Sequence, residues 1–414
     1  MINLELPKKF DLLIAQSHQA AAEIFRPNSR RYDTAEHEYP KELDMLAALI
    51  DGMSESGAMG GAGAAMVGGG EGNGDGARAA EDDGRARNGG NMASLLGLIE
   101  LCWGDVGLLL SMPRQGLGQA AIAAVADAEQ LKRFGGKWAA MAITEPEAGS
   151  DSAAIRTTAT YDEKAGEYIL NGEKIYVTAG DRAELIVVWA TLDRSKGRGA
   201  IKSFVVERDN PGLKLDRLQP KLGIRASDTA NFLLTDCRVP RKNLLGDPEI
   251  QEARQGFAGV MKTFDNTRPM VAGMAVGVAR ACLERTRELL AEAGIAIDYD
   301  RAGPGQPAAA AEFIAMEADW EAARLLTLQA AWMADNKRPN SLQASMAKAK
   351  AGRMGTDVAL RCVALCGATG YAETELLEKW SRDAKILDLF EGTQQIQLLI
   401  IARQLLGKSS SELK

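Results

Sequence analysis

Apolar residues recur along this chain with two different periods, and the change of period divides it into three stretches. In residues 1–137 and again in residues 248–414 they return every three or four positions, as in amphipathic helices. In residues 138–247 they form short runs rich in Val, Ile and Leu, which favour strands. We therefore expect an N-terminal helical domain over 1–137, a middle β domain over 138–247 and a C-terminal helical bundle over 248–414.

The two helical stretches contain several segments with an apolar stripe. We expect helices over residues 8–26, from residue 39, within 91–134, and over 256–290, 308–334, 341–365 and 396–406. Long helices joined by short connections favour a bundle of antiparallel helices. The expected fold is therefore mainly α with one β domain.

The middle stretch predicts a small β structure. Short strands are expected over residues 139–144, 167–170, 173–177, 185–191, 201–206 and 231–239. Asn171 and Gly172 suit the tight turn of a hairpin, because both residues tolerate a positive φ. Strands at this spacing favour an antiparallel barrel or sandwich.

Residues 52–90 have a different composition and hold 14 of the 43 glycines. Such a segment loses too much entropy on ordering to form a core. The glycines and alanines at 61–65 suggest a dinucleotide-binding loop, but the third glycine and the preceding strand are missing. We expect a flexible surface loop.

Charge and cysteine content exclude some classes of function. The chain has 49 Lys and Arg against 56 Asp and Glu, a net charge of -7, which argues against nucleic acid as a partner. No apolar run is long enough to cross a membrane, and the first ten residues do not resemble a secretory signal. The five cysteines are odd in number and scattered, as in a reduced compartment, so we expect a cytoplasmic protein. Zinc binding at Cys362 and Cys366 would need further ligands, and His18 and His37 are distant in sequence.

One carboxylate near the C-terminus is a candidate general base. Glu391 lies between Phe390 and Gly392, and the apolar run that follows predicts a helix. Desolvation by apolar neighbours raises a carboxyl pKa toward values that suit proton abstraction. The alternative is a structural Glu that the helix dipole stabilises. The residue pattern alone leaves both interpretations open.

Several segments together resemble the signatures of acyl-CoA dehydrogenases, in the family's order. They are Met-Ala-Ile-Thr-Glu-Pro-Glu-Ala-Gly-Ser-Asp at 141–151, Tyr-Val-Thr at 176–178, Phe-Asp-Asn-Thr-Arg-Pro at 264–269, and the segment 381–397 around Glu391. The resemblance extends from about residue 10 to residue 407. It implies an N-terminal helical domain, a middle antiparallel β barrel, a C-terminal four-helix bundle and a tetramer.

The resemblance also implies an activity, with FAD as cofactor. An acyl-CoA thioester would be dehydrogenated to the trans-2-enoyl-CoA, with Glu391 removing the α-proton and flavin N5 accepting the β-hydride. Hydrogen bonds to the thioester carbonyl would stabilise the developing negative charge. The electrons would pass to an electron-transferring flavoprotein.

Roles for further residues follow only from this resemblance. The flavin ring is expected to contact Met141, Ile143, Thr144, Tyr176 and Thr178, and Gly149, Ser150 and Val177 are also expected to bind the cofactor. The adenosine half of the cofactor is expected near Thr393 and Gln395. The acyl-CoA is expected to contact Ser150, Phe264, Asp265, Arg268, Gly392 and Arg403.

Two segments depart from the family pattern. Where the family has Arg-x-x-Phe-Gly, residues 293–297 are Ala-Gly-Ile-Ala-Ile, and where it has Gln-x-x-Gly-Gly, residues 364–368 are Ala-Leu-Cys-Gly-Ala. Both motifs serve flavin bound mainly to a neighbouring subunit. The hypothesis is a mixed tetramer in which a related chain supplies the missing Arg; the alternative is a homotetramer with a substitute such as Arg301. A half-site or non-catalytic subunit and an acyl-CoA oxidase are further alternatives.

Overall fold

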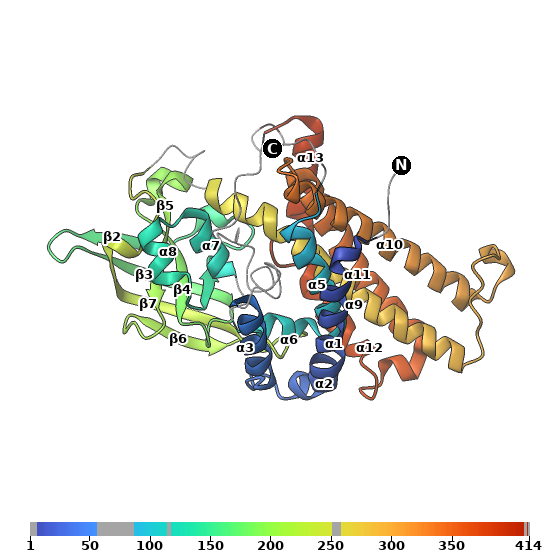
Figure 1. Cartoon of the computed structure of the whole chain (residues 1–414). Coiled ribbons are helices and arrows are strands. Elements are labelled where there is room, and N and C mark those ends of the chain that lie inside the picture. Colours follow the sequence, from blue (N-terminus) through green and yellow to red (C-terminus); the bar gives the residue numbers. More distant parts are fainter. Residues whose placement is uncertain (1–5, 56–86, 114–116, 251–257, 410–411, 413–414) are drawn as a thin grey trace.

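The computed structural model describes residues 6–55, 87–113, 117–250, 258–409 and 412. Figure 1 shows the strands gathered on one side of the molecule and the long C-terminal helices on the other. Residues 56–86 of the glycine-rich segment lie outside the described residues, so the loop expected there stays a prediction.

The N-terminal part is helical, as predicted. Its elements are η1 (Lys8–Phe10), α1 (Asp11–Ala20), the π-helical η2 (Ala21–Phe25), α2 (Arg26–Thr34), α3 (Glu42–Glu55), α5 (Gly90–Gly104), α6 (Val106–Ser111), α7 (Leu117–Val125) and α8 (Ala128–Phe134). Asp105 begins α6, because its side chain accepts a hydrogen bond from the Leu108 backbone N–H at 2.8 Å.

The strands form one mixed sheet. They are β1 (Ala139–Ala142), β2 (Thr158–Asp162), β3 (Glu167–Thr178), β4 (Leu185–Thr191), β5 (Ile201–Glu207), β6 (Leu213–Leu218), β7 (Thr229–Pro240) and β8 (Leu244–Leu245). Their order is β6-β7-β3-β2-β4-β5-β8, with β1 also paired to β4. The β domain is confirmed, but β1 and β2 both meet β4 in parallel, so the sheet is not wholly antiparallel.

The predicted hairpin turn at Asn171 and Gly172 is wrong. Both residues lie inside the continuous strand β3, and the hairpin partner of β3 is β2. A Cβ at position 172 would lie 2.4 Å from the Thr157 Oγ1. The glycine is therefore needed for close packing and not for a turn.

The C-terminal part is a helical bundle. It contains α9 (Ala258–Glu292), η6 (Gly303–Gly305), α10 (Ala308–Asp335), α11 (Ser341–Tyr371), α12 (Leu377–Ala384), η7 (Lys385–Asp388) and α13 (Gln394–Leu406). Helices α9, α10 and α11 pack against one another, and α12, η7 and α13 pack on α11. Helix α5 also packs on α9 and α10, so one core joins the N- and C-terminal helices. The predicted fold class is confirmed, while the exact domain boundaries remain a prediction.

A buried ionic network ties α12 to the rest of the molecule. The Asp383 carboxylate accepts a hydrogen bond from the Ile224 backbone N–H at 2.6 Å and lies 2.7 Å from the Lys379 Nζ. Lys379 also contacts Asp105, and all three charged side chains are buried. The network therefore fixes the helix that leads to Glu391 against both the β domain and α6.

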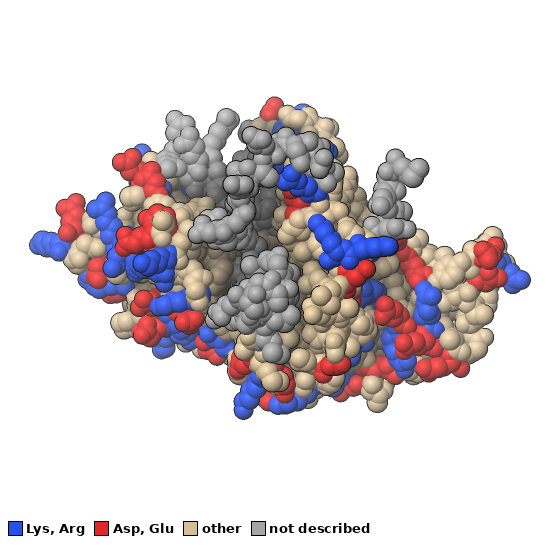
Figure 2. All heavy atoms as spheres, in the orientation of Figure 1, with Lys and Arg blue, Asp and Glu red and all other residues tan. Residues whose placement is uncertain are grey.

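Charged side chains of both signs are interspersed over the face drawn in Figure 2. Among the described helices none is long and apolar enough to cross a membrane. The described His, Cys, Asp and Glu residues include no group of three or more that could hold a metal ion. All five cysteines are free thiols.

Candidate active site

The predicted flavin contacts on the strands lie beside one another. Met141, Ile143 and Thr144 are partly exposed at the end of β1. The Ile175 backbone N–H donates to the Thr144 carbonyl at 2.9 Å, which brings residues 143–144 beside the exposed Tyr176. We call Met141, Ile143, Thr144, Tyr176 and Thr178 the strand-edge cluster.

Tyr176 is turned outward by an irregularity in β3. The pairing of β3 with β7 shifts register between Lys174 and Val177, as in a β-bulge. Tyr176 has a φ of 59°, and the residue is 61% exposed. Its backbone N–H donates to the buried Asn231 side chain at 3.3 Å. A large aromatic side chain held exposed on strained backbone is typical of a functional position.

An ion pair lies buried behind the strand-edge cluster. The Lys174 Nζ is 2.6 Å from the Glu145 carboxylate and donates to the Ile143 carbonyl at 3.2 Å. Burial lowers the pKa of Lys174 to about 8, against the opposing effect of Glu145. Burial acts to raise the pKa of Glu145, but Lys174 and Thr157 hold it below its ordinary value. The pair thus fixes the backbone that presents Ile143 and Thr144.

The other predicted strand-side residues lie close by in sequence and differ in exposure. Gly149 and Ser150 are exposed after the short bridge between Glu145 and Ala148. Val177 is buried, and Thr178 is partly exposed at the end of β3.

Glu391 lies in the loop of residues 390–393 that leads into α13. Its φ is 56° and that of Gly392 is 92°, so two successive residues adopt left-handed backbone. A Cβ at Gly392 would lie 2.4 Å from the Gln397 Nε2, which explains why glycine follows the carboxylate. Thr393 begins α13, its hydroxyl accepting a 3.4 Å hydrogen bond from the Ile396 backbone N–H.

The Glu391 side chain meets the long helix α9. Its Oε2 accepts a hydrogen bond from the Thr267 hydroxyl at 3.0 Å. Burial raises the pKa of the Glu391 carboxyl, while Thr267 and the charges of Arg268 and Lys348 act to lower it. This environment fits the candidate base better than a solvated helix-start Glu.

Two buried side chains hold the 390–393 loop from inside the bundle. Lys348 of α11 donates to the Gly392 carbonyl at 2.7 Å. Gln397 donates to the carbonyls of Glu391 and Gly392 at 3.2 and 3.1 Å. Burial lowers the pKa of Lys348 to about 8, and the nearby Asp388 and Glu391 oppose that shift.

The remaining predicted residues lie on the two helices that flank this loop. Arg268 is buried on α9 one residue after Thr267. Gln395 is exposed and Arg403 partly exposed on α13. Phe264 and Asp265 fall within α9, but their side chains lie outside the described residues. The structure thus brings Arg268, Glu391, Gly392 and Thr393 together.

Comparison with known proteins identifies the family. Residues 140–237 match the model of the acyl-CoA dehydrogenase middle domain, and residues 254–406 match that of its C-terminal domain. A probable acyl-CoA dehydrogenase of Bacillus subtilis (strain 168) is 38% identical over 272 residues, which cover 64% of this chain and 67% of that protein. The chain belongs to the acyl-CoA dehydrogenase family.

Two other members of this family of oxidoreductases are similar over much of the chain. The mitochondrial short-chain specific acyl-CoA dehydrogenase of Rattus norvegicus is 38% identical over 279 residues, 66% of this chain and 64% of that protein. The matched segments thus span about two thirds of the length of these relatives. The structure of butyryl-CoA dehydrogenase from Megasphaera elsdenii superimposes with a TM-score of 0.79 and 28% identity, covering 98% of this chain and all of that one.

The family implies a flavin, and the residues present fit one. The strand-edge cluster offers an exposed aromatic ring and two partly exposed threonines along one sheet edge. On α13, the buried Gln394 Oε1 at the start of the helix and the Arg403 Nε in its last turn have no hydrogen-bond partner among the described residues. Such polar atoms suit the polar parts of a bound cofactor.

Sequence reasoning missed the side chains that support the candidate site. Thr267 lies within the segment quoted for the resemblance but was given no role. Lys348 carries a signal of its own, because it lies on the stripe of buried residues formed by Ala344, Ala351 and Gly352. A lysine on a buried stripe requires a specific partner. Lys174, which lies within a predicted strand, carries the same kind of signal.

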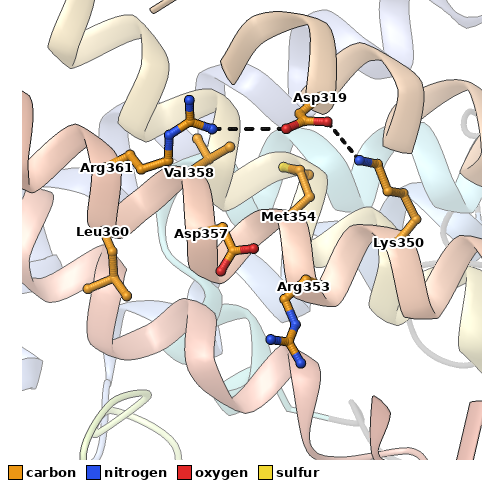
Figure 3. A pocket seen from close by; sticks show the side chains of 8 residues that line it. All are labelled: Asp319, Lys350, Arg353, Met354, Asp357, Val358, Leu360 and Arg361. Atoms are coloured by element: carbon orange, nitrogen blue, oxygen red, sulfur yellow. Dashed lines mark hydrogen bonds and ion pairs between the residues drawn. The ribbon is translucent and has the colours of Figure 1, made fainter. Parts of the chain in front are cut away.

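A separate surface pocket of about 360 Å³ lies between α10 and α11, away from Glu391. Figure 3 shows Asp319 there between Lys350, at 2.8 Å, and Arg361, at 4.0 Å. Arg361 also pairs with Glu312, and Arg353 lies 3.9 Å from Asp388, both of them outside the lining. None of the lining residues belongs to the candidate site.

Proposed function

We propose that this chain catalyses the α,β-dehydrogenation of an acyl-CoA thioester, with Glu391 as the base. The observation that carries the proposal is the Glu391 carboxylate, held on left-handed backbone and bonded to Thr267. Its raised pKa makes it a stronger base than an exposed carboxylate. FAD, when bound at the strand-edge cluster, would supply the hydride acceptor at its N5.

The residues around Glu391 would have separate roles in the reaction. Thr267 bonds Oε2 of Glu391, so Oε1 is the oxygen that takes the α-proton. The Arg268 charge favours the ionised carboxylate before the reaction. An acyl chain that fills the pocket would exclude water and strengthen both the base and the hydrogen bonds to the thioester oxygen.

A short acyl chain is the substrate class we propose. The relatives from rat and Megasphaera elsdenii are named for short-chain and butyryl-CoA substrates. We propose a saturated four-carbon thioester as the first compound to test. The electrons would pass to an electron-transferring flavoprotein, as the family resemblance implies.

For the assembly, we propose a tetramer that includes a second, related chain. Residues 293–297 follow α9 and include no cation where the family has its Arg. Arg301, the alternative anchor for a homotetramer, donates to the Gly305 carbonyl at 3.1 Å and so already has a partner. This observation favours the mixed tetramer.

The test is anaerobic bleaching of the flavin by a series of acyl-CoAs of increasing length. We expect the protein, with its partner chain where one is needed, to bleach fastest with a short chain. E391Q should retain flavin and bleach about 10³-fold more slowly, the middle of the range for loss of one general base. Rapid bleaching by E391Q would refute the assignment. Steady peroxide formation in air would instead indicate an oxidase.

A further inference from the structure

The loop that carries Glu391 is held by an unusual pair of buried donors. Lys348 is completely buried on α11, yet its Nζ bonds a neutral carbonyl, that of Gly392, at 2.7 Å. Gln397, also completely buried, donates to the carbonyls of Glu391 and Gly392, which belong to the two peptides that flank Gly392. Two donors from two helices therefore converge on the only two residues of the loop with left-handed backbone.

Within the described part of the chain, no carboxylate is bonded to Lys348. The charged groups that face it are Arg268 on α9, Asp388 in η7 and Glu391. Asp388 lies 3.2 Å from Lys385 and 3.9 Å from Arg353. The charge of Lys348 interacts with both carboxylates, more with Asp388 than with Glu391, and at Glu391 it favours the ionised form together with Arg268.

This arrangement links a structural contact to the chemistry. A buried lysine without a bonded carboxylate is costly, and an apolar residue at position 348 would remove that cost. Left-handed backbone at a non-glycine residue persists only where its surroundings enforce it. A cation at this place both enforces the backbone and favours the ionised carboxylate.

We propose that Lys348 is a positioning residue for the reaction: it fixes the backbone at Gly392, next to the base, and favours the ionised Glu391 carboxylate. The inference rests on the proposed function, since it assigns Glu391 as the base. Lys348 itself touches neither substrate nor flavin in this role.

Two variants separate the two parts of the role. K348M removes the donor and the charge, whereas K348Q keeps a donor and removes only the charge. We expect K348M to bleach 10- to 100-fold more slowly with substrate, about the effect of a misplaced catalytic group, and K348Q to recover part of the loss. In both variants the acidic limb of the pH profile should move to higher pH, because a cation near the base is gone.

The matched control is K350M, a lysine two residues along α11 that pairs with Asp319 on the surface. Its bleaching rate and pH profile should equal those of the unaltered protein. A K348M protein whose acidic limb is unchanged would overturn the proposal, even if it bleached slowly. A lysine with a purely structural role would change only the amount of folded, flavin-loaded protein, and that amount does not shift the pH profile.

A second readout needs no turnover. The infrared band of the protonated Glu391 carboxyl is identified as the band that E391Q lacks. As the pH is lowered, this band should appear at a higher pH in K348M than in the unaltered protein. If no acyl-CoA bleaches the unaltered protein but this band moves, the proposed function fails, and only the effect of the Lys348 charge on Glu391 stands. If bleaching occurs and the band does not move, the role of Lys348 fails alone.

Discussion

The strand-edge cluster and the loop of residues 390–393 are built in a similar way, and they differ in the partner of the buried lysine behind each. Tyr176 on the strand edge and Glu391 on the helical side both have left-handed backbone, with φ of 59° and 56°. Each lies in front of a fully buried lysine whose pKa burial lowers to about 8. Lys174 bonds the carboxylate of Glu145, whereas Lys348 bonds the carbonyl of Gly392.

Under the proposed function, the difference separates a structural charge from one that bears on the base. The charge of Lys174 is paired with Glu145 behind the strand-edge cluster. The charge of Lys348 is shared between Asp388 and Glu391. Removing each lysine should therefore affect different properties of the protein.

The largest expected effect is on stability, at Lys174. K174M leaves Glu145 buried without its cation and should lower the free energy of unfolding by about 3–5 kcal/mol. Loss of hydrogen bonds alone should cost K348M about 1–3 kcal/mol. Urea unfolding of both variants measures the difference. The double variant E145Q/K174M should regain much of the lost stability, because it no longer buries an unpaired carboxylate. A K348M protein less stable than K174M would contradict the distinction drawn between the two lysines.

The next effect concerns the dependence of stability on pH. The pKa of Lys348 falls from 10.5 to about 8 on folding, so between these values the unfolded chain binds more protons. Stability from this group therefore rises as pH increases from 8 to 10.5, by on the order of 3 kcal/mol in total. The K348M protein lacks this rise, so its deficit relative to the unaltered protein should grow across that window. Unfolding curves at pH 8 and pH 10 measure it; a constant deficit would contradict the expectation.

The smallest effect is expected at Thr267. T267V removes the hydrogen bond to Glu391 Oε2, which should raise the carboxyl pKa and cost about 1 kcal/mol, or roughly fivefold in rate. The pH profile of flavin bleaching shows both changes, with the acidic limb moved to higher pH. T267S keeps the hydroxyl and serves as the control. An identical pH profile for T267V and T267S would show that the Thr267 hydroxyl has no effect on Glu391.

Much of the fold could be predicted, because period and length distinguish helices from strands. The predicted strand at 185–191 coincides with β4, and the predicted helix at 308–334 with α10 to within one residue. Strands β2 and β6 were missed because polar and charged residues interrupt their apolar pattern. The error at Gly172 arose because one residue type serves both tight turns and close strand packing.

For the candidate site, sequence segments indicated Glu391 and the strand-edge cluster but not what lies behind them. The contacts of Lys348 with Gly392 and of Thr267 with Glu391 join residues 44 and 124 positions apart in the chain. No local pattern encodes such pairs, since they depend on how α9, α11 and α13 pack. A charged residue on a buried stripe was the one available signal.

The φ of 56° at Glu391 also bears on how this position tolerates change. Glycine or asparagine would adopt that backbone at less cost, by about 1 kcal/mol. Stability alone would therefore favour replacement of Glu391, whereas the proposed role as base would favour its retention. A copy of this chain without that role, for instance beside a second active chain, would gain stability by losing its carboxylate.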